Sequence, residues 1–213
     1  MDIICARHGN TFAPGDRVIW VGRNQDIPLV QAGEQQARTL ALALRNARIG
    51  PVAIFCAPLK RTRRYAELLA EGLGRSEAPV VDGRLTEIDY GDWAGLTNQE
   101  VEQIGHGESQ RLWYEEMIWP QDANWTGSEA EIRGGVEAFL QMIRHDFRPD
   151  DTVLAVSSNG ILRYFALAAL GADARRDPRF PFKMRTGHVG KIREERGTAS
   201  LLYWDAAPGS VSL

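Results

Sequence analysis

The first apolar run of the chain ends on two residues that can handle a phosphate group. Asp2-Ile3-Ile4-Cys5-Ala6 is typical of a buried strand, and Arg7-His8-Gly9-Asn10-Thr11 follows it directly. Open α/β sheets carry their chemistry at the carboxyl ends of their strands. A guanidinium offers a fork of donors to phosphate oxygens, and an imidazole beside it is suited to attack phosphorus. The sequence therefore predicts a phosphate site at the end of this strand.

Three other segments place polar residues at the ends of core elements. Arg61 lies in the first turn of a helix predicted after the strand-like run Ala53–Cys56, where free backbone N–H groups also attract anions. Glu87 lies in a glycine-punctuated loop. The turn Ser157-Ser158-Asn159-Gly160 follows another apolar run. We expect these segments to meet at one edge of the sheet.

The alternation of strand-like and helix-like segments predicts the fold class. The strand-like segments are 3–6, 52–56, 152–156 and 199–203, and the helix-like segments are 31–45, 59–73, 128–147 and 160–170. Ser128 and Glu131 have the spacing of a capping box at the start of one helix. Alternation of this kind predicts a three-layer α/β/α protein with a mostly parallel central sheet.

A polar, tryptophan-rich stretch interrupts this alternation. Residues 97–126 are expected to form a small helical cap or lid, with two short helices and a loop. Trp113, Trp119 and Trp125 either pack this lid or form a wall of the substrate crevice, and a wall of this kind would favour a substrate with an apolar or ring-shaped body. The segment 12–23 is expected to fold over the site.

The composition limits the number of domains and the kinds of partner that we expect. A chain of 213 residues with 44% hydrophobic content fits a single domain over 1–213, with the cap inserted in it. A net charge of -3 gives no bulk attraction to nucleic acid or to an anionic membrane, and no apolar run is long enough to span a bilayer. The amino terminus has no pattern of a signal peptide, so we expect a cytoplasmic protein. Cys5 and Cys56 are expected to be reduced core thiols.

Several of these segments together resemble the histidine phosphatase superfamily, the group that contains the cofactor-dependent phosphoglycerate mutases. The shared motifs, in family order, are Arg-His-Gly-x-Thr from Arg7, Pro-Leu-x-Arg ending at Arg61, Leu-x-Glu-x-x-x-Gly-x-Trp around Glu87, and a small-residue turn before Ile161-x-Arg163. The resemblance extends from residue 2 to about residue 205. Several anchors in order, each in a strand-to-helix context, are far more specific than one tripeptide.

The resemblance implies a role for each matching residue. His8 is the nucleophile that accepts the phosphoryl group, and Arg7 and Arg61 hold the phosphate oxygens. Glu87 is the acid that protonates the leaving alkoxide and later activates water, although Asp89 and Asp92 compete with it in the same loop. The family pattern implies no metal and no cofactor.

Four further residues complete the predicted site. Asn10, Ser158 and Asn159 are expected to donate to the phosphate. Ser158 stands where the family has its second histidine, which removes a charged donor, and His188 is a candidate substitute in a turn before a further strand-like run.

The predicted function is hydrolysis of a small phosphomonoester through a phosphohistidine on His8. Two alternatives stay open: a mutase-type phosphoryl transfer, and a non-catalytic member that binds a phosphorylated ligand, which the replacement by Ser158 motivates. No nucleic-acid or membrane partner is expected, and a homo-oligomer stays open. Arg163 is expected to form a structural ion pair.

Overall fold

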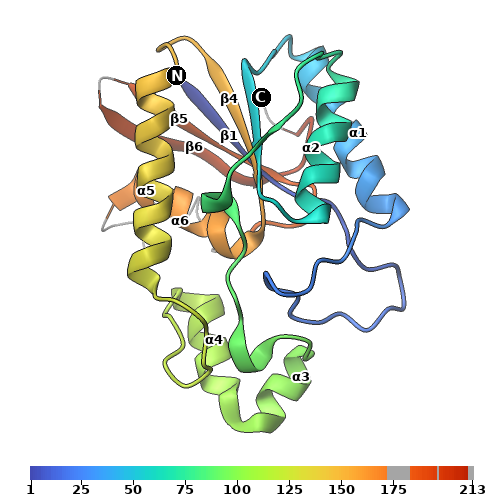
Figure 1. Ribbon diagram of the computed structural model, residues 1–213, viewed down its shortest axis with the longest axis vertical. Coiled ribbons are helices and arrows are strands. Elements are labelled where there is room, and N and C mark those ends of the chain that lie inside the picture. Colours follow the sequence, from blue (N-terminus) through green and yellow to red (C-terminus); the bar gives the residue numbers. More distant parts are fainter. Residues whose placement is uncertain (172–182, 196, 211–213) are drawn as a thin grey trace.

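A six-stranded mixed sheet forms the centre of the protein (Figure 1). The computed structural model describes residues 1–171, 183–195 and 197–210. The strands run in the order β3-β2-β4-β1-β5-β6, and their bounds are β1 Asp2–Arg7, β2 Ala53–Cys56, β3 Val80–Val81, β4 Thr152–Ser157, β5 Val189–Glu195 and β6 Thr198–Ala206. The first four strands of this order pair in parallel, whereas β5 and β6 add an antiparallel edge. The predicted mostly parallel sheet is confirmed.

Helices cover both faces of the sheet, as the period of the sequence predicts. The helices α1 (Gln31–Asn46) and α2 (Lys60–Gly72) lie on one face, and α5 (Glu129–Asp146) and α6 (Asn159–Leu170) lie on the other (Figure 1). The predicted capping box is present at the start of α5, because Ser128 and Glu131 bond reciprocally to each other's backbone N–H groups.

The side chains of β1 point alternately to the two faces of the sheet, so this strand packs against both layers of helices. Ile3 and Cys5 pack into the core beneath α5 and α6, whereas Ile4 and Ala6 pack beneath α1 and α2. Successive side chains of a strand point to opposite faces, so an unbroken apolar run is buried on both sides. The strand is therefore rigid where Arg7 and His8 leave it. Cys5 and Cys56 are buried and form no disulfide.

The tryptophan-rich stretch extends away from the sheet as a separate group of short helices (Figure 1). These are α3 (Asn98–Val101), the irregular turn η3 (Glu102–His106) and α4 (Gly107–Glu116). Short 3₁₀ turns, η1 (Gly83–Leu85) and η2 (Gly91–Trp93), precede them. Among the described residues, no helix is long and apolar enough to cross a membrane.

The aromatic side chains of this region form a packed cluster. Trp125 contacts Trp93, Trp113 and Trp119 edge to face, with ring centroids 5.0, 4.9 and 5.1 Å away. Such pairs stabilise beyond the area they bury. Packing is therefore the role of Trp119 and Trp125, while Trp113 also reaches the crevice described below.

Two glycines allow α1 to approach the loop that follows β1. A Cβ on Gly9 would lie 2.3 Å from the carbonyl oxygen of Gly33, and a Cβ on Gly33 would lie 2.2 Å from that of Asn10. Both distances are shorter than the contacts that a Cβ atom makes with backbone atoms in proteins. The absence of side chains at both positions sets the path of the loop that carries His8.

We expect Gly33→Ala to lower the free energy of unfolding by about 1–3 kcal/mol, because the added methyl overpacks two backbones. Urea unfolding measures the change. Gly135→Ala in α5 is the matched control, since nothing lies within 4 Å of its added Cβ. An unchanged stability of Gly33→Ala would contradict the close approach.

Candidate active site

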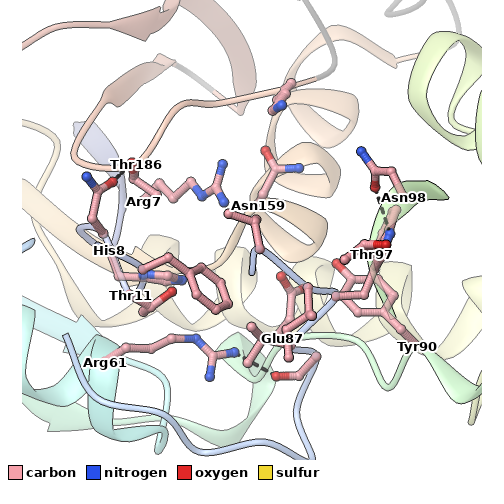
Figure 2. A pocket seen from close by; sticks show the side chains of 18 of the residues that line it. Arg7, His8, Thr11, Arg61, Glu87, Tyr90, Thr97, Asn98, Asn159 and Thr186 are labelled. Atoms are coloured by element: carbon pink, nitrogen blue, oxygen red, sulfur yellow. Dashed lines mark hydrogen bonds between the residues drawn. The ribbon is translucent and has the colours of Figure 1, made fainter. Parts of the chain in front are cut away.

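A crevice of about 800 Å³ opens at the carboxyl ends of the parallel strands. Arg7, His8 and Arg61 gather at one side of it and Glu87 lies near its centre (Figure 2). The segment that follows His8 lines the crevice through Phe12–Pro14 and Val18–Gly22, as expected from the sequence. The four motifs that lie far apart in the chain therefore meet in one cavity.

The His8 ring is held in one tautomer by its own loop. Its Nδ1 lies 2.8 Å from the carbonyl oxygen of Gly9, which can only accept, so Nδ1 carries the proton. The Nε2 atom is then left with its lone pair. The backbone N–H of His8 donates to the Ser157 carbonyl at 3.1 Å, which ties the loop to β4.

Burial and two neighbouring cations keep this imidazole uncharged. His8 is 5% exposed. Burial lowers its pKa well below the usual value, and the positive charges of Arg61 and Arg7 lower it further. The nucleophilic form of the ring is therefore the populated form at neutral pH.

Arg61 and Arg7 are each fixed by backbone carbonyls and not by carboxylates. Arg61 donates to the carbonyl of Gly22 at 2.7 Å and to that of Gln25 at 3.1 Å. Arg7 donates through Nη1 to the carbonyl of Met184, and its backbone N–H donates to that of His188 at 3.0 Å. Because neither guanidinium is neutralised by an ion pair among the described residues, both keep their charge for an anion.

The Glu87 carboxyl is positioned by three donors. It accepts the N–H of Ile88 at 2.9 Å, the N–H of Gly160 at 3.3 Å, and the hydroxyl of Tyr90. Burial raises the pKa of Tyr90 well above its usual value, with a further contribution from Glu87, so this hydroxyl keeps its proton and donates. Of the three carboxylates in this loop, Glu87 lines the crevice, whereas Asp89 and Asp92 are not among its described lining residues.

Two asparagines lie in the crevice with their carbonyl oxygens already engaged. Asn10 Oδ1 accepts the hydroxyl of Thr186, and Asn159 Oδ1 accepts the N–H of Met184 at 2.8 Å. An engaged oxygen fixes the orientation of the amide and leaves its NH₂ group as a donor. Both side chains can therefore donate to a bound phosphate.

Ser158 and His188 lie differently from the asparagines. Ser158 is buried, and its hydroxyl has no partner among the described residues. His188 Nδ1 lies 2.9 Å from the carbonyl oxygen and 3.1 Å from a carboxylate oxygen of Asp205. Neither residue is among the described residues that line the crevice, whereas Asn159 lines it and lies beside the Arg7 side chain (Figure 2).

Arg163 differs from the ion pair that the sequence led us to expect. It is fully buried, donates through Nη1 to the carbonyl of Trp113 at 3.0 Å, and lies 4.8 Å from the centre of that indole ring. No carboxylate within the described part of the chain pairs with it. A cation–π contact with Trp113 of α4 takes the place of the expected ion pair.

Residues 1–171, 183–195 and 197–210 contain no group of three or more histidine, cysteine, aspartate or glutamate side chains that could hold a metal ion. The crevice instead contains the guanidinium groups of Arg7 and Arg61 and the imidazole of His8, which are groups that can bind an oxyanion.

Comparison with known proteins narrows the class of this three-layer α/β protein. A family model for the histidine phosphatase superfamily (branch 1) matches residues 3–207. The chain therefore belongs to the histidine phosphatase superfamily, and the resemblance found in the sequence is confirmed.

Two curated relatives are similar to most of the chain. Phosphoserine phosphatase 1 of Hydrogenobacter thermophilus is 33% identical over 158 residues, which are 72% of this chain and 71% of that protein. A protein named probable phosphoglycerate mutase GpmB, from Cronobacter sakazakii, is 27% identical over 199 residues, or 90% and 84% of the two chains.

Solved structures share the fold at low identity. A mycobacterial glucosyl-3-phosphoglycerate phosphatase superposes with a TM-score of 0.81 at 22% identity, covering 97% of this chain and 99% of that one. A putative alpha-ribazole-5'-P phosphatase from Escherichia coli gives 0.76 at 24% identity, covering 99% and 100%. At this level of identity the likeness concerns the fold alone.

Gly160 allows the Glu87 carboxyl to sit against the first turn of α6. A Cβ at this position would lie 2.4 Å from Glu87 Oε1 and 2.7 Å from the Tyr90 hydroxyl. Both atoms are at the ends of side chains, which can move aside without unfolding the protein. A methyl group here is therefore expected to displace the Glu87 carboxyl, the predicted acid.

We expect Gly160→Ala to lower kcat by about 10²- to 10⁴-fold, the usual contribution of a positioned acid, with the melting temperature maintained. Steady-state kinetics and thermal unfolding measure the two effects. Gly134→Ala, whose added Cβ meets nothing within 4 Å, is the control for the gain in helix propensity. Full activity of Gly160→Ala would show that the Glu87 position is unimportant.

The lowered pKa of His8 predicts a pH dependence of stability. Below pH 6.5, the usual pKa of histidine, the unfolded chain takes up a proton at this position that the folded protein does not. The unfolded state then binds more protons, so the free energy of unfolding falls as the pH drops from 6.5 towards the folded pKa.

We expect His8→Gln to remove this contribution, so that the wild type loses stability relative to the variant as the pH drops from 6.5. Urea unfolding at a series of pH values measures it. His145→Gln, at a side chain that is 88% exposed, is the control. A difference between wild type and His8→Gln that is independent of pH would mean that the ring is not kept neutral by its surroundings.

Proposed function

We propose that this protein hydrolyses phosphomonoesters through a phosphohistidine formed on His8. The observation that carries the proposal is the buried, neutral imidazole, whose Nε2 lone pair is left available between two guanidinium groups. Phosphoryl transfer needs positioning and compensation of negative charge more than covalent chemistry from the protein. This arrangement supplies both.

In the first step, His8 Nε2 attacks the phosphorus in line with the ester oxygen. The N–P bond forms as the P–O bond to the alcohol breaks, and Arg7 and Arg61 bind the equatorial oxygens throughout. Glu87 donates its proton to the departing alkoxide. Alcohol leaves, and the enzyme holds a phosphohistidine and a glutamate carboxylate.

In the second step, the carboxylate of Glu87 accepts a proton from water. The oxygen of that water attacks the phosphorus, the P–N bond breaks, and His8 recovers its lone pair. Inorganic phosphate leaves and Glu87 is again protonated. The three donors on Glu87 hold the carboxyl in one place through both steps.

The replacement of the family's second histidine by Ser158 removes one charged donor. In the proposed site, the NH₂ groups of Asn10 and Asn159 take over the contacts to the phosphoryl oxygens, and their engaged carbonyl oxygens keep these amides in the donating orientation. Neutral donors hold a developing charge less strongly than a cation does. The proposal therefore predicts turnover without requiring His188.

The names of similar proteins support hydrolysis over transfer, since the relatives include a phosphoserine phosphatase and glucosyl-3-phosphoglycerate phosphatases. The probable phosphoglycerate mutase among them favours a second candidate, in which the phosphohistidine returns the group to a second hydroxyl. Hydrolysis is the preferred proposal because the site contains fewer charged donors with which to retain the phosphoryl group.

The setting of this activity is also part of the proposal. The substrate is small and phosphorylated, and the protein works in the cytoplasm without a nucleic-acid or membrane partner, which its net charge of -3 supports. Residues 97–126 serve as a cap inserted in a single domain.

We expect His8→Ala to lower phosphate release by about a thousandfold or more, because the covalent route is lost. A panel of phosphomonoesters with a phosphate assay measures it. Rapid acid-free quenching and peptide mass analysis of the wild type should find one added PO₃H on the peptide that contains His8. His145→Ala, at an exposed ring, is the control for a histidine substitution.

The outcomes separate the three candidate functions. Release of phosphate with a transient phosphoenzyme supports the phosphatase. A long-lived phosphoenzyme with exchange between two positions of one substrate would support the mutase. Measurable binding of esters without any release or phosphoenzyme would leave only a binding protein and overturn the proposal.

A further inference from the structure

The crevice is much larger than a phosphate group and changes character away from His8. Its far walls come from the loop after the nucleophile and from the helices beyond the sheet. Apolar and aromatic side chains that line the crevice include Val18, Ile19, Trp20, Trp113 and Tyr114. A substrate with only a short polar body would leave this surface in contact with water. The cavity therefore has room for an apolar body attached to the phosphate.

One polar side chain stands among these walls with a defined orientation. Asn98, on the side of the crevice opposite to His8, presents its amide to the cavity (Figure 2). Its Oδ1 accepts the indole N–H of Trp20 at 2.9 Å and the hydroxyl of Tyr114 at 3.3 Å. Two donors on the oxygen fix which end of the amide is nitrogen. The NH₂ group has no partner among the described residues and can donate to a ligand.

The position of Asn98 is set by contacts between segments. Trp20 is bound to the backbone around the lid, since its N–H donates to Leu96 and its carbonyl accepts from Gly95, at 2.9 and 2.8 Å. The buried Gln110 donates to the Asn98 carbonyl at 3.4 Å. The donor is therefore held on a preorganised surface, which lowers the entropy lost on binding.

Two of the charges near the far walls are already occupied. Arg17 pairs with Glu100, and Arg163 is fully buried against Trp113. Lys183 also lines the crevice, and its Nζ lies 6.0 Å from the centre of the Tyr114 ring. Burial together with Arg7 and Arg163 lowers the pKa of Lys183. Aromatic rings, the Asn98 amide and the Lys183 ammonium therefore lie at this end of the crevice.

We infer that the far end of the crevice is a specificity site for a ring-bearing substrate body, in which Asn98 donates a hydrogen bond to an acceptor atom on the ring. The inference rests on the proposed phosphatase function. The ring packs against the aromatic pair Trp20 and Tyr114. Asn98 is a specificity residue and takes no part in the transfer of the phosphoryl group.

The test uses phosphate esters with matched leaving groups. A phenylethyl phosphate with a para acetyl group offers an acceptor on the ring, and the same ester with a para isopropyl group has the same number of heavy atoms without an acceptor. Ethyl phosphate has no ring, and phosphoserine has a charged body. Because the first three are esters of primary alcohols, differences in kcat/KM report on the body of the substrate.

We expect the wild type to prefer both ring esters to ethyl phosphate and phosphoserine, and to prefer the acetyl ester to the isopropyl ester. Asn98→Asp keeps the oxygen that accepts from Trp20 and Tyr114 but replaces the donor by an acceptor. The ratio of kcat/KM for the acetyl ester to that for the isopropyl ester should fall about tenfold or more. Gln103→Glu, an exposed amide on the neighbouring turn, is the control for the added charge and should leave the ratio unchanged.

Three results would overturn the inference: a preference of the wild type for phosphoserine, equal use of the acetyl and isopropyl esters, or an unchanged ratio in Asn98→Asp. The first two results are measured on the wild type, so they test the inference even if Asn98→Asp fails to fold. Should no ester be hydrolysed, the proposed function fails. Calorimetric binding of the acetyl ester, weakened in Asn98→Asp, would then still support the specificity site, and equal binding would overturn it.

Discussion

The site depends on one uncharged imidazole kept beside two guanidinium groups. A cation next to a histidine lowers the tendency of the ring to take up a proton, and burial acts in the same direction. In the proposed reaction, the same cations that keep the His8 ring uncharged also compensate the charge of the phosphate. Because Arg7 and Arg61 are bound by backbone carbonyls, their positions are fixed while their charges stay available.

Carboxamides extend this arrangement along the crevice. Asn10, Asn159 and Asn98 each have the side-chain oxygen engaged by a donor of the protein, so each keeps its NH₂ group as a donor. In the proposed site, the first two bind the phosphoryl oxygens in place of the family's second histidine. The third lies among aromatic rings, where we infer that it donates to the body of the substrate. We thus propose the same arrangement, an amide held by its oxygen with the NH₂ group as donor, for phosphate binding at one end of the crevice and for substrate recognition at the other.

The sequence predicted the layers of the fold and the segments that meet at the sheet edge. Apolar runs such as that before Arg7 are buried on both faces of a parallel sheet, and polar residues that follow such runs can emerge only at its carboxyl edge. The capping box at Ser128 and the helix that brings Arg61 forward are equally local. These features depend on neighbours in the chain, which is why their spacing was sufficient.

Partners that are distant in the chain were decided by the tertiary structure. Arg163 contacts Trp113 where an ion pair was expected, His188 faces Asp205 and not the crevice, and no motif in the sequence points to Asn98. Each outcome depends on how α6, β5 and the lid helices dock, and no local pattern encodes that docking. Sequence by itself determined which residues could reach the edge of the sheet, because strand burial is a local property. Only the packed structure decided which of them share a cavity and which way their donors point, since those are relations between segments brought together by folding.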